Sequence, residues 1–187
     1  MLLEKFDDLK DVLLIKPRVF KDNRGYFLES YNQQKFEELT GIGTPFIQDN
    51  ESESCYGTLR GLHFQKPPFA QAKLVRVVKG RVLDVALDLR PSSPTFGHHK
   101  SFILDDENKH QLYIPRGFAH AFLVLSESAI FSYKVDNSYA PDHDSGIIFS
   151  DETLKIDWPI ATDDILVSEK DNTLQSFLEY KNNPDFK

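Results

Sequence analysis

Short apolar runs separated by turn-forming residues recur along most of this 187-residue sequence. The first run, residues 12–15, predicts a strand, and Pro17 close behind it indicates a sheet edge or a break. Residues 21–25 have the composition of a turn. The next run, residues 26–31, again predicts a strand, so the N-terminal part of the chain favours β-structure.

One helix is predicted near the N-terminus, over residues 32–39. Asn32 can cap its first turn, and Gly41 can end it. The tail, residues 174–187, is polar, which is typical of either a short helix or a frayed end. Helices are therefore expected only at the periphery of a mainly β protein.

The centre of the chain is rich in predicted strands. Residues 59–65 alternate between larger apolar and polar or small side chains, as a half-buried strand does. Residues 73–78 form a second apolar run, and Lys79 and Gly80 after it are a tight-turn signal. Residues 81–89 alternate again, which predicts that they form a hairpin with the run before the turn.

Four more short strands are predicted, over residues 101–104, 111–114, 119–125 and 129–135. Turn residues separate them at roughly ten-residue spacing, which is typical of an antiparallel sandwich or barrel. Because no repeat, low-complexity segment or linker interrupts the sequence, residues 1–187 are expected to form one all-β domain.

Composition narrows the class of protein further. The hydrophobic content of 40% excludes a disordered protein, and the aromatic content of 12% favours β-structure. The net charge of −7 argues against a nucleic-acid binder. Cys55 is the only cysteine, which excludes a disulfide scaffold and a cysteine-based zinc site. Since neither a cleavable leader nor a run of roughly 18 apolar residues is present, we expect a soluble, cytoplasmic protein without membrane contact.

Three polar residues lie inside apolar strands: His63, His120 and Tyr133. Strand parity places His120 on the same face as Phe118 and Phe122, and the same rule places Tyr133 on an apolar face. Such faces are expected to line the interior of a barrel, where a polar group needs a partner or a ligand. These positions therefore predict a functional pocket.

Each candidate residue also has an ordinary structural explanation. A single histidine such as His63 is more often a hydrogen-bonded core or surface residue, and Tyr133 alone is more often part of the packing. Lys73 alone would be a solvated strand end, and Arg60 alone would form a surface ion pair. Only the occurrence of all four together favours chemistry.

The histidine spacing does not favour a metal site. The first histidine, His63, is followed by none until His98, so it has no nearby partner. His98 and His99 are adjacent and would point to opposite faces of a strand. His110 and His143 lie in turn-like surroundings. A metal-dependent barrel is therefore the least favoured of the enzymatic alternatives.

A series of longer motifs resembles those of one known family. They run in order from about residue 12 to residue 172 and read as follows: Phe20-x-Asp22-x-Arg24-Gly25-x-Phe27-x-Glu29, Gln48-Asp49-Asn50-x-Ser52-x-Ser54-x-x-Gly57-x-Leu59-Arg60-Gly61-Leu62-His63-Phe64-Gln65, Gln71-x-Lys73-Leu74-Val75, Asp88-Leu89-Arg90-x-Ser92-x-Pro94-Thr95-Phe96-Gly97, Ile114-Pro115-x-Gly117-Phe118-Ala119-His120, Asp157-Trp158-Pro159 and Leu166-x-Ser168-x-Lys170-Asp171. On these motifs the chain resembles the dTDP-4-dehydrorhamnose 3,5-epimerases.

The resemblance implies a cupin-type jelly-roll β-barrel that works as a homodimer without metal or another cofactor. The implied reaction converts dTDP-4-dehydro-6-deoxy-D-glucose to dTDP-4-dehydro-L-rhamnose in dTDP-L-rhamnose biosynthesis. The apolar N-terminal strand is a candidate for an edge that is swapped between the two copies.

The resemblance also implies roles for individual residues. His63 would be the general base and Tyr133 the general acid, while Asp171 would orient His63 and Lys73 would stabilise an enolate. The residues that would contact the sugar, the diphosphate or the nucleotide are Arg24, Glu29, Gln48, Asn50, Arg60, His120, Asp144 and Lys170.

Three positions depart from the usual family pattern. Glu53 stands where a basic residue is common, Ala121 where glycine is common, and Asp144 where glutamate is common. None of them removes a proposed acid or base, but Glu53 changes the charge expected near the site. Two alternatives remain open from the sequence: an epimerase that acts at C3 or C5 alone, and a non-catalytic barrel that binds sugar nucleotides.

Overall fold

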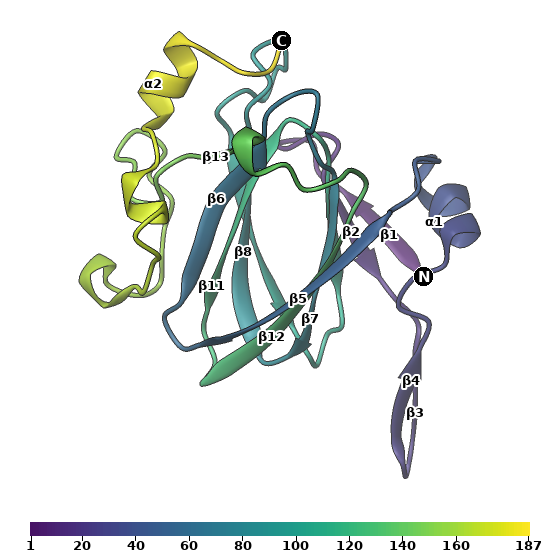
Figure 1. Cartoon of the computed structure of the whole chain (residues 1–187). Helices are drawn as coiled ribbons and strands as arrows, with labels where there is room; N and C mark the ends of the chain where they lie inside the picture. Colours follow the sequence, from purple (N-terminus) through teal and green to yellow (C-terminus); the bar gives the residue numbers. More distant parts are fainter.

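Two antiparallel sheets face each other in the computed structural model, which describes residues 1–187 (Figure 1). The six-stranded sheet contains, in spatial order, β1 (Leu2–Lys5), β2 (Leu13–Lys16), β10 (Gln111–Ile114), β7 (Lys73–Lys79), β12 (Ser128–Val135) and β5 (Gln48–Cys55). The five-stranded sheet contains β13 (Asp144–Gly146), β6 (Leu59–Gln65), β11 (Phe118–Val124), β8 (Arg81–Asp88) and β9 (His99–Asp105). The all-β architecture predicted from the sequence is confirmed.

The remaining elements lie around this barrel. The hairpin of β3 (Val19–Asp22) and β4 (Gly25–Leu28) projects away from it (Figure 1). The helices are short: α1 (Gln33–Thr40), α2 (Phe177–Asn182) and the single 3₁₀ turns η1 (Pro141–His143), η2 (Thr162–Asp164) and η3 (Asp171–Thr173). No helix is long and apolar enough to cross a membrane.

The hydrophobic core has an interior part and two outer parts. Between the sheets, Val75, Phe118, Phe122 and Phe131 are buried, and the last two rings stack with centroids 4.0 Å apart. The outer face of the five-stranded sheet is covered by the C-terminal part of the chain, and that of the six-stranded sheet by α1. The predicted interior face of β11, with Phe118 and Phe122, is thereby confirmed.

The hairpin predicted between residues 73–78 and 81–89 is wrong. β7 pairs with β10 and β12 in one sheet, whereas β8 pairs with β11 and β9 in the other. Gly80 between them has a φ of +86°, and a Cβ there would lie 2.2 Å from the carbonyl oxygen of Ser128. The turn is real, but it carries the chain from one sheet to the other.

The helix predicted over residues 32–39 is confirmed as α1. The Asn32 side chain accepts a hydrogen bond from the backbone N–H of Lys35, and Gly41 ends the helix in the left-handed region at φ +78°. The strand predicted over residues 26–31 is shorter, because β4 ends at Leu28.

The polar tail is packed onto the barrel, so the frayed alternative is wrong. Ser176 and Glu179 form a capping box at the start of α2. The Tyr180 side chain is fully buried, and its hydroxyl donates to the carbonyl of Leu89 over 2.8 Å. Phe186 is also buried, at 9% exposure.

Candidate active site

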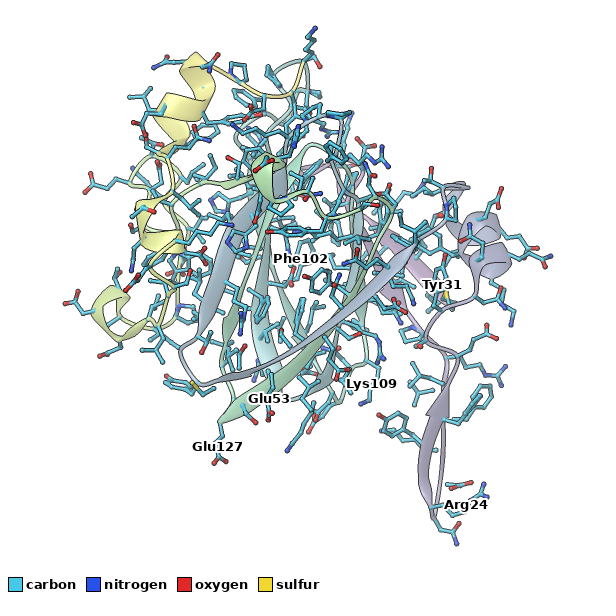
Figure 2. All side chains as sticks on the ribbon, in the orientation of Figure 1. Arg24, Tyr31, Glu53, Phe102, Lys109 and Glu127 are labelled. Carbon is cyan, nitrogen blue, oxygen red and sulfur yellow. The ribbon has the colours of Figure 1, made fainter.

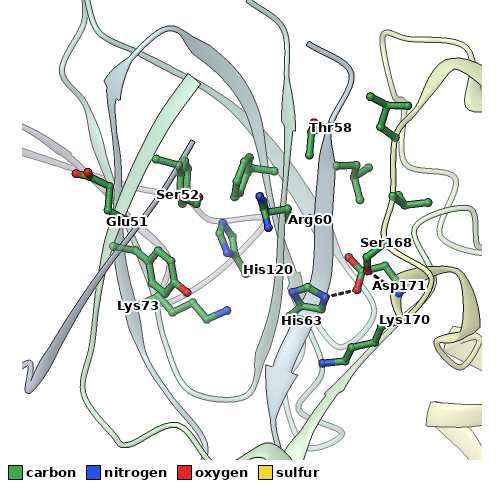
Figure 3. Close-up of a pocket in the computed structure, with 16 residues that line it drawn as sticks. Glu51, Ser52, Thr58, Arg60, His63, Lys73, His120, Ser168, Lys170 and Asp171 are labelled. Carbon is green, nitrogen blue, oxygen red and sulfur yellow. Dashed lines mark hydrogen bonds and ion pairs between the residues drawn. The ribbon is translucent and has the colours of Figure 1, made fainter. Parts of the chain in front are cut away.

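A cavity of about 510 Å³ opens between the two sheets next to the C-terminal stretch 166–171 (Figure 3). Both sheets and that stretch contribute to its walls. Its lining consists of Glu51, Ser52, Thr58, Leu59, Arg60, His63, Lys73, His120, Phe122, Phe131, Tyr133, Leu166, Val167, Ser168, Lys170 and Asp171. Seven of the residues predicted from the sequence therefore meet in one pocket.

His63 and Asp171 form a hydrogen-bonded pair at the edge of this cavity (Figure 3). His63 Nε2 lies 2.7 Å from Asp171 Oδ1, and Asp171 Oδ2 accepts from the backbone N–H of Gly61 at 3.3 Å. Burial by itself would raise the pKa of the Asp171 carboxyl, but hydrogen bonds from His63 and Gly61 outweigh burial and lower that pKa. Asp171 is thus held as a carboxylate against the imidazole.

The sequence around Gly61 lets β6 approach β11 closely at this point. Gly61 has a φ of +124°, and a Cβ on it would lie 2.4 Å from the carbonyl oxygen of His120 and 2.7 Å from Ala121 Cβ. Only glycine fits such a position. The close approach places His63 opposite His120 in the strand register, so both rings enter the same cavity.

Lys73 begins β7 on the facing sheet and brings an ammonium group into the cavity. Burial lowers the pKa of Lys73 to about 8, although the charges of Asp144 and Asp84 act in the opposite direction. None of the ion pairs in the protein includes Lys73. Its charge is therefore available to a bound molecule.

Tyr133 lies on β12, also in the six-stranded sheet. Burial raises the pKa of its hydroxyl, while the neighbouring charge of Arg60 lowers it to a smaller extent. The phenol consequently keeps its proton at neutral pH. An acidic proton is thus present on the wall opposite the strand that carries His63.

His120 forms a second, fully enclosed histidine–aspartate pair. Its Nε2 lies 2.9 Å from Oδ2 of Asp84, whose side chain is 0% exposed. Burial lowers the pKa of His120, although the carboxylate of Asp84 opposes this. Asp84 is a site residue that the sequence reasoning missed; the available signal was an acidic residue inside an apolar strand, at a position facing the interior.

Two cationic side chains stand at the mouth of the cavity. Arg60 donates from Nε to Ser54 Oγ at 3.1 Å and forms no ion pair, so most of its guanidinium is free. Lys170 bonds to Asp144, whose Oδ2 also accepts from the Tyr139 hydroxyl at 3.1 Å. This positive charge at the entrance suits a diphosphate group.

Gln48 and Asn50 lie beside the main cavity and not in its wall. Both line a smaller hollow of about 280 Å³ together with Gln71, Tyr133 and Tyr139. The Gln48 amide donates to Asn50 Oδ1 at 2.8 Å. Since Tyr133 borders both cavities, the small hollow adjoins the large one.

Arg24 and Glu29 lie on or next to the β3–β4 hairpin, outside the main cavity. Arg24 lies at the tip of the projecting β3–β4 hairpin, 2.6 Å from Asp22 (Figure 2). Glu29 follows the hairpin and pairs with Lys35 of α1 at 2.8 Å. Neither residue lines the main cavity, so this chain alone does not bring them to the site.

Several lining residues were missed, two of them because β5 was not predicted as a strand. Glu51 and Ser52 come from β5, and Leu166 and Val167 come from the loop before Asp171. Of the departures from the family pattern, Glu53 is exposed on β5 and does not line the main cavity. Nowhere do three His, Cys, Asp or Glu side chains lie together as metal ligands.

Acid–base groups on both walls of a pocket in a cupin-type barrel define a class: enzymes that move protons on a bound substrate. A family model described as dTDP-4-dehydrorhamnose 3,5-epimerase matches residues 7–179. The chain belongs to this family of epimerases, as the sequence motifs indicated.

Individual relatives agree with this assignment. The dTDP-4-dehydrorhamnose 3,5-epimerase of Pseudomonas aeruginosa is 53% identical over 171 residues, covering 91% of this chain and 93% of the relative. The crystal structure of an enzyme of that name from Elizabethkingia anophelis NUHP1 is 54% identical, with a TM-score of 0.90 and coverage of 96% and 97%. A dTDP-6-deoxy-D-glucose-3,5-epimerase from Legionella pneumophila, in complex with dTDP-4-keto-L-rhamnose, is 43% identical, with a TM-score of 0.89 and coverage of 94% and 92%.

Proposed function

We propose that this chain inverts C3 and C5 of dTDP-4-dehydro-6-deoxy-D-glucose and produces dTDP-4-dehydro-L-rhamnose, with His63 as base and Tyr133 as acid. Family membership and the similarity to a relative complexed with dTDP-4-keto-L-rhamnose support this substrate. The observation that carries the mechanism is the origin of His63 and Tyr133 on the two facing sheets around one cavity.

One base suffices for both carbons. The C4 ketone acidifies the hydrogens on C3 and C5, and in the D-gluco configuration both hydrogens are axial on the same face of the ring. Histidine titrates near neutral pH and is suited to remove them. Because His63 Nε2 is bonded to Asp171, Nδ1 is left to accept the proton, and the carboxylate supports the imidazolium that forms.

Loss of the proton moves an electron pair onto the C4 oxygen and creates an enolate. The ammonium group of Lys73, unpaired in the protein, supplies positive charge for that oxygen. His120, whose ring is held in place by Asp84, lines the same cavity as Lys73. The barrel thus offers a preorganised site for negative charge that develops during the reaction.

Inversion requires that the new proton arrive from the opposite face. Tyr133 Oη gives its proton to the carbon, which leaves a phenolate, while His63 holds the proton that was removed. Exchange of protons with solvent restores both groups before the second carbon reacts. The position of His63 and Tyr133 on two facing walls of the cavity supports these roles.

The diphosphate of the substrate must bind to a protein of net charge −7. Long-range electrostatics oppose this, so local cations are needed. Arg60 and Lys170 at the mouth of the cavity supply them, and Asp144 then shares Lys170 with the incoming diphosphate.

The Tyr133→Phe variant is expected to separate proton removal from inversion. Without the phenol, His63 still removes the proton and returns a deuteron to the same face in deuterated water. Inversion should fall by about 10²-fold or more, the usual contribution of a general acid, while deuterium exchange into unreacted substrate falls by less than about tenfold. Proton NMR of substrate and product measures both rates.

Tyr113→Phe is the matched control for this experiment, since Tyr113 is buried under α1 outside the cavity. It should leave both rates unchanged. Equal losses of exchange and inversion in Tyr133→Phe would contradict the role of Tyr133 as acid, and so would undiminished inversion.

We also propose that two copies of the chain form a homodimer through the β3–β4 hairpin. Phe20, Tyr26 and Phe27 on this hairpin are exposed at 49%, 52% and 68%, an apolar surface that a monomer would leave in water. The same hairpin carries Arg24, which lies outside the cavity of its own chain. Reaching the second copy would give Arg24 a nucleotide-binding role there.

Analytical ultracentrifugation tests the dimer. The wild-type chain should sediment as a dimer, and Phe27→Glu should shift it toward a monomer with a raised KM. Leu178→Glu, at a position on α2 that is 57% exposed, should remain dimeric. A monomeric wild-type chain with full activity would contradict the dimer proposal.

A further inference from the structure

The C-terminal end of the chain packs directly behind the strand that carries His63. The rings of Tyr180 and Phe186 each lie with their centroid 5.6 Å from the ring of Phe64. Because neighbouring side chains of a strand point to opposite faces, Phe64 faces these rings while His63 faces the cavity. Tyr180 and Phe186 lie beyond the residues that the family model matches.

Asp171, the partner of His63, belongs to the same C-terminal segment. Between Asp171 and Lys187 this segment is fastened to the barrel by hydrogen bonds of 2.7 to 3.2 Å. These run from Ile148 N to Gln175 O, from Phe177 N to Asp151 Oδ2, from Tyr180 Oη to Leu89 O and from Ser92 Oγ to Lys187 O. The beginning of the segment thus holds the aspartate, and its end holds the strand of the histidine.

Support from the sheet itself is limited on one side of His63. Its neighbour there, β13, is only three residues long, and Gly146 is its register partner. The aromatic packing behind Phe64 therefore supports β6 together with the backbone hydrogen bonds of Leu62 to Ile147 and of Leu59 to Leu166. A shift of about 1 Å in a reacting group can cost up to about 10²-fold in rate.

We propose that residues 171–187 act as a clamp that sets the His63–Asp171 separation, with Phe186 as a positioning residue. The inference rests on the proposed function, because it assigns His63 the role of base. Phe186 does not line the cavity and packs against Phe64 on the opposite face of β6. Its loss should therefore affect the chemical step and not substrate binding.

Kinetics of Phe186→Ala and Phe186→Leu test the clamp. For the alanine variant we expect kcat to fall about tenfold with KM changed by less than about twofold, and leucine should restore most of kcat. Phe36→Ala is the matched control: Phe36 is also buried, at 3% exposure against 9% for Phe186, but it packs from α1 onto the outer face of the other sheet. It should lower thermal stability while leaving kcat unchanged.

Proton NMR gives a readout that does not depend on turnover. The ring N–H of His63 that bonds to Asp171 should give a low-field resonance, assigned by its absence from His63→Ala. We expect this resonance to broaden in Phe186→Ala and to stay sharp in Phe36→Ala. If Phe186→Ala does not fold, Phe186→Leu carries the comparison, with a smaller loss of kcat and partial broadening.

The clamp is overturned if both Phe186 variants lose stability but keep wild-type kcat and a sharp resonance. It is also overturned if Phe36→Ala lowers kcat as much as Phe186→Ala. Failure of the proposed function gives a different result, because His63→Ala would then keep its turnover. The low-field resonance of the wild type would still report whether Phe186 holds the His63–Asp171 pair.

Discussion

The His63→Ala variant is expected to lose epimerisation at both carbons. Removing a general base costs about 10²- to 10⁴-fold, and His63 serves C3 and C5 alike, so turnover should fall by at least about 10³-fold. Asp171 remains in place but has no ring to support. An assay coupled to a 4-keto sugar reductase measures the loss, and deuterium uptake should stop at both carbons.

The fold of this variant should stay intact, because the His63 side chain is 30% exposed and leaves a space that is open to the cavity. Circular dichroism and thermal unfolding check this. His110→Ala is a suitable control, since His110 directly precedes β10 and does not line the cavity. Near wild-type turnover in His63→Ala would show that the base has been wrongly assigned.

Replacing Lys73 by methionine should reduce kcat by about 10²- to 10³-fold, the usual cost of removing one group that stabilises an oxyanion. Methionine keeps most of the length of the side chain, so the loss reports the charge. Lys73→Arg should recover part of the rate, because it restores a cation at the start of β7. Equal kcat in the wild type and Lys73→Met would exclude an electrostatic role.

The same lysine predicts a pH dependence. Burial lowers the pKa of Lys73 to about 8, and the protonated form is the one that stabilises the enolate. In the free enzyme the ammonium is present below that pH and is lost above it, so kcat/KM of the wild type should fall as the pH rises through about 8. Lys73→Arg should move this fall to higher pH.

Much of the fold could be predicted from hydrophobic alternation, but sheet assignment could not. The pair Lys79–Gly80 marked a turn, yet hairpin turns and corners between sheets use the same residue types. β5 was not predicted as a strand because its sequence, Gln48–Cys55, is almost entirely polar. It forms because all eight of its residues pair with β12, a long-range interaction that local sequence does not encode.

The candidate site was predictable to a similar degree. Polar residues inside apolar strands pointed to His120 and Tyr133, and burial on the interior face bears out that argument. The pairing of His63 with Asp171, which are 108 residues apart, had no local signal and came only from the family resemblance. Asp84 escaped notice because one acidic residue in a strand does not reveal which histidine lies beside it.

The most direct test of the proposed function is proton NMR of the wild-type enzyme with dTDP-4-dehydro-6-deoxy-D-glucose in deuterated water. We predict deuterium at both C3 and C5 of the product, and dTDP-L-rhamnose once a 4-keto reductase is added. Deuterium at only one carbon would contradict double epimerisation and indicate an enzyme for a single centre. Exchange at neither carbon would contradict the catalytic account altogether.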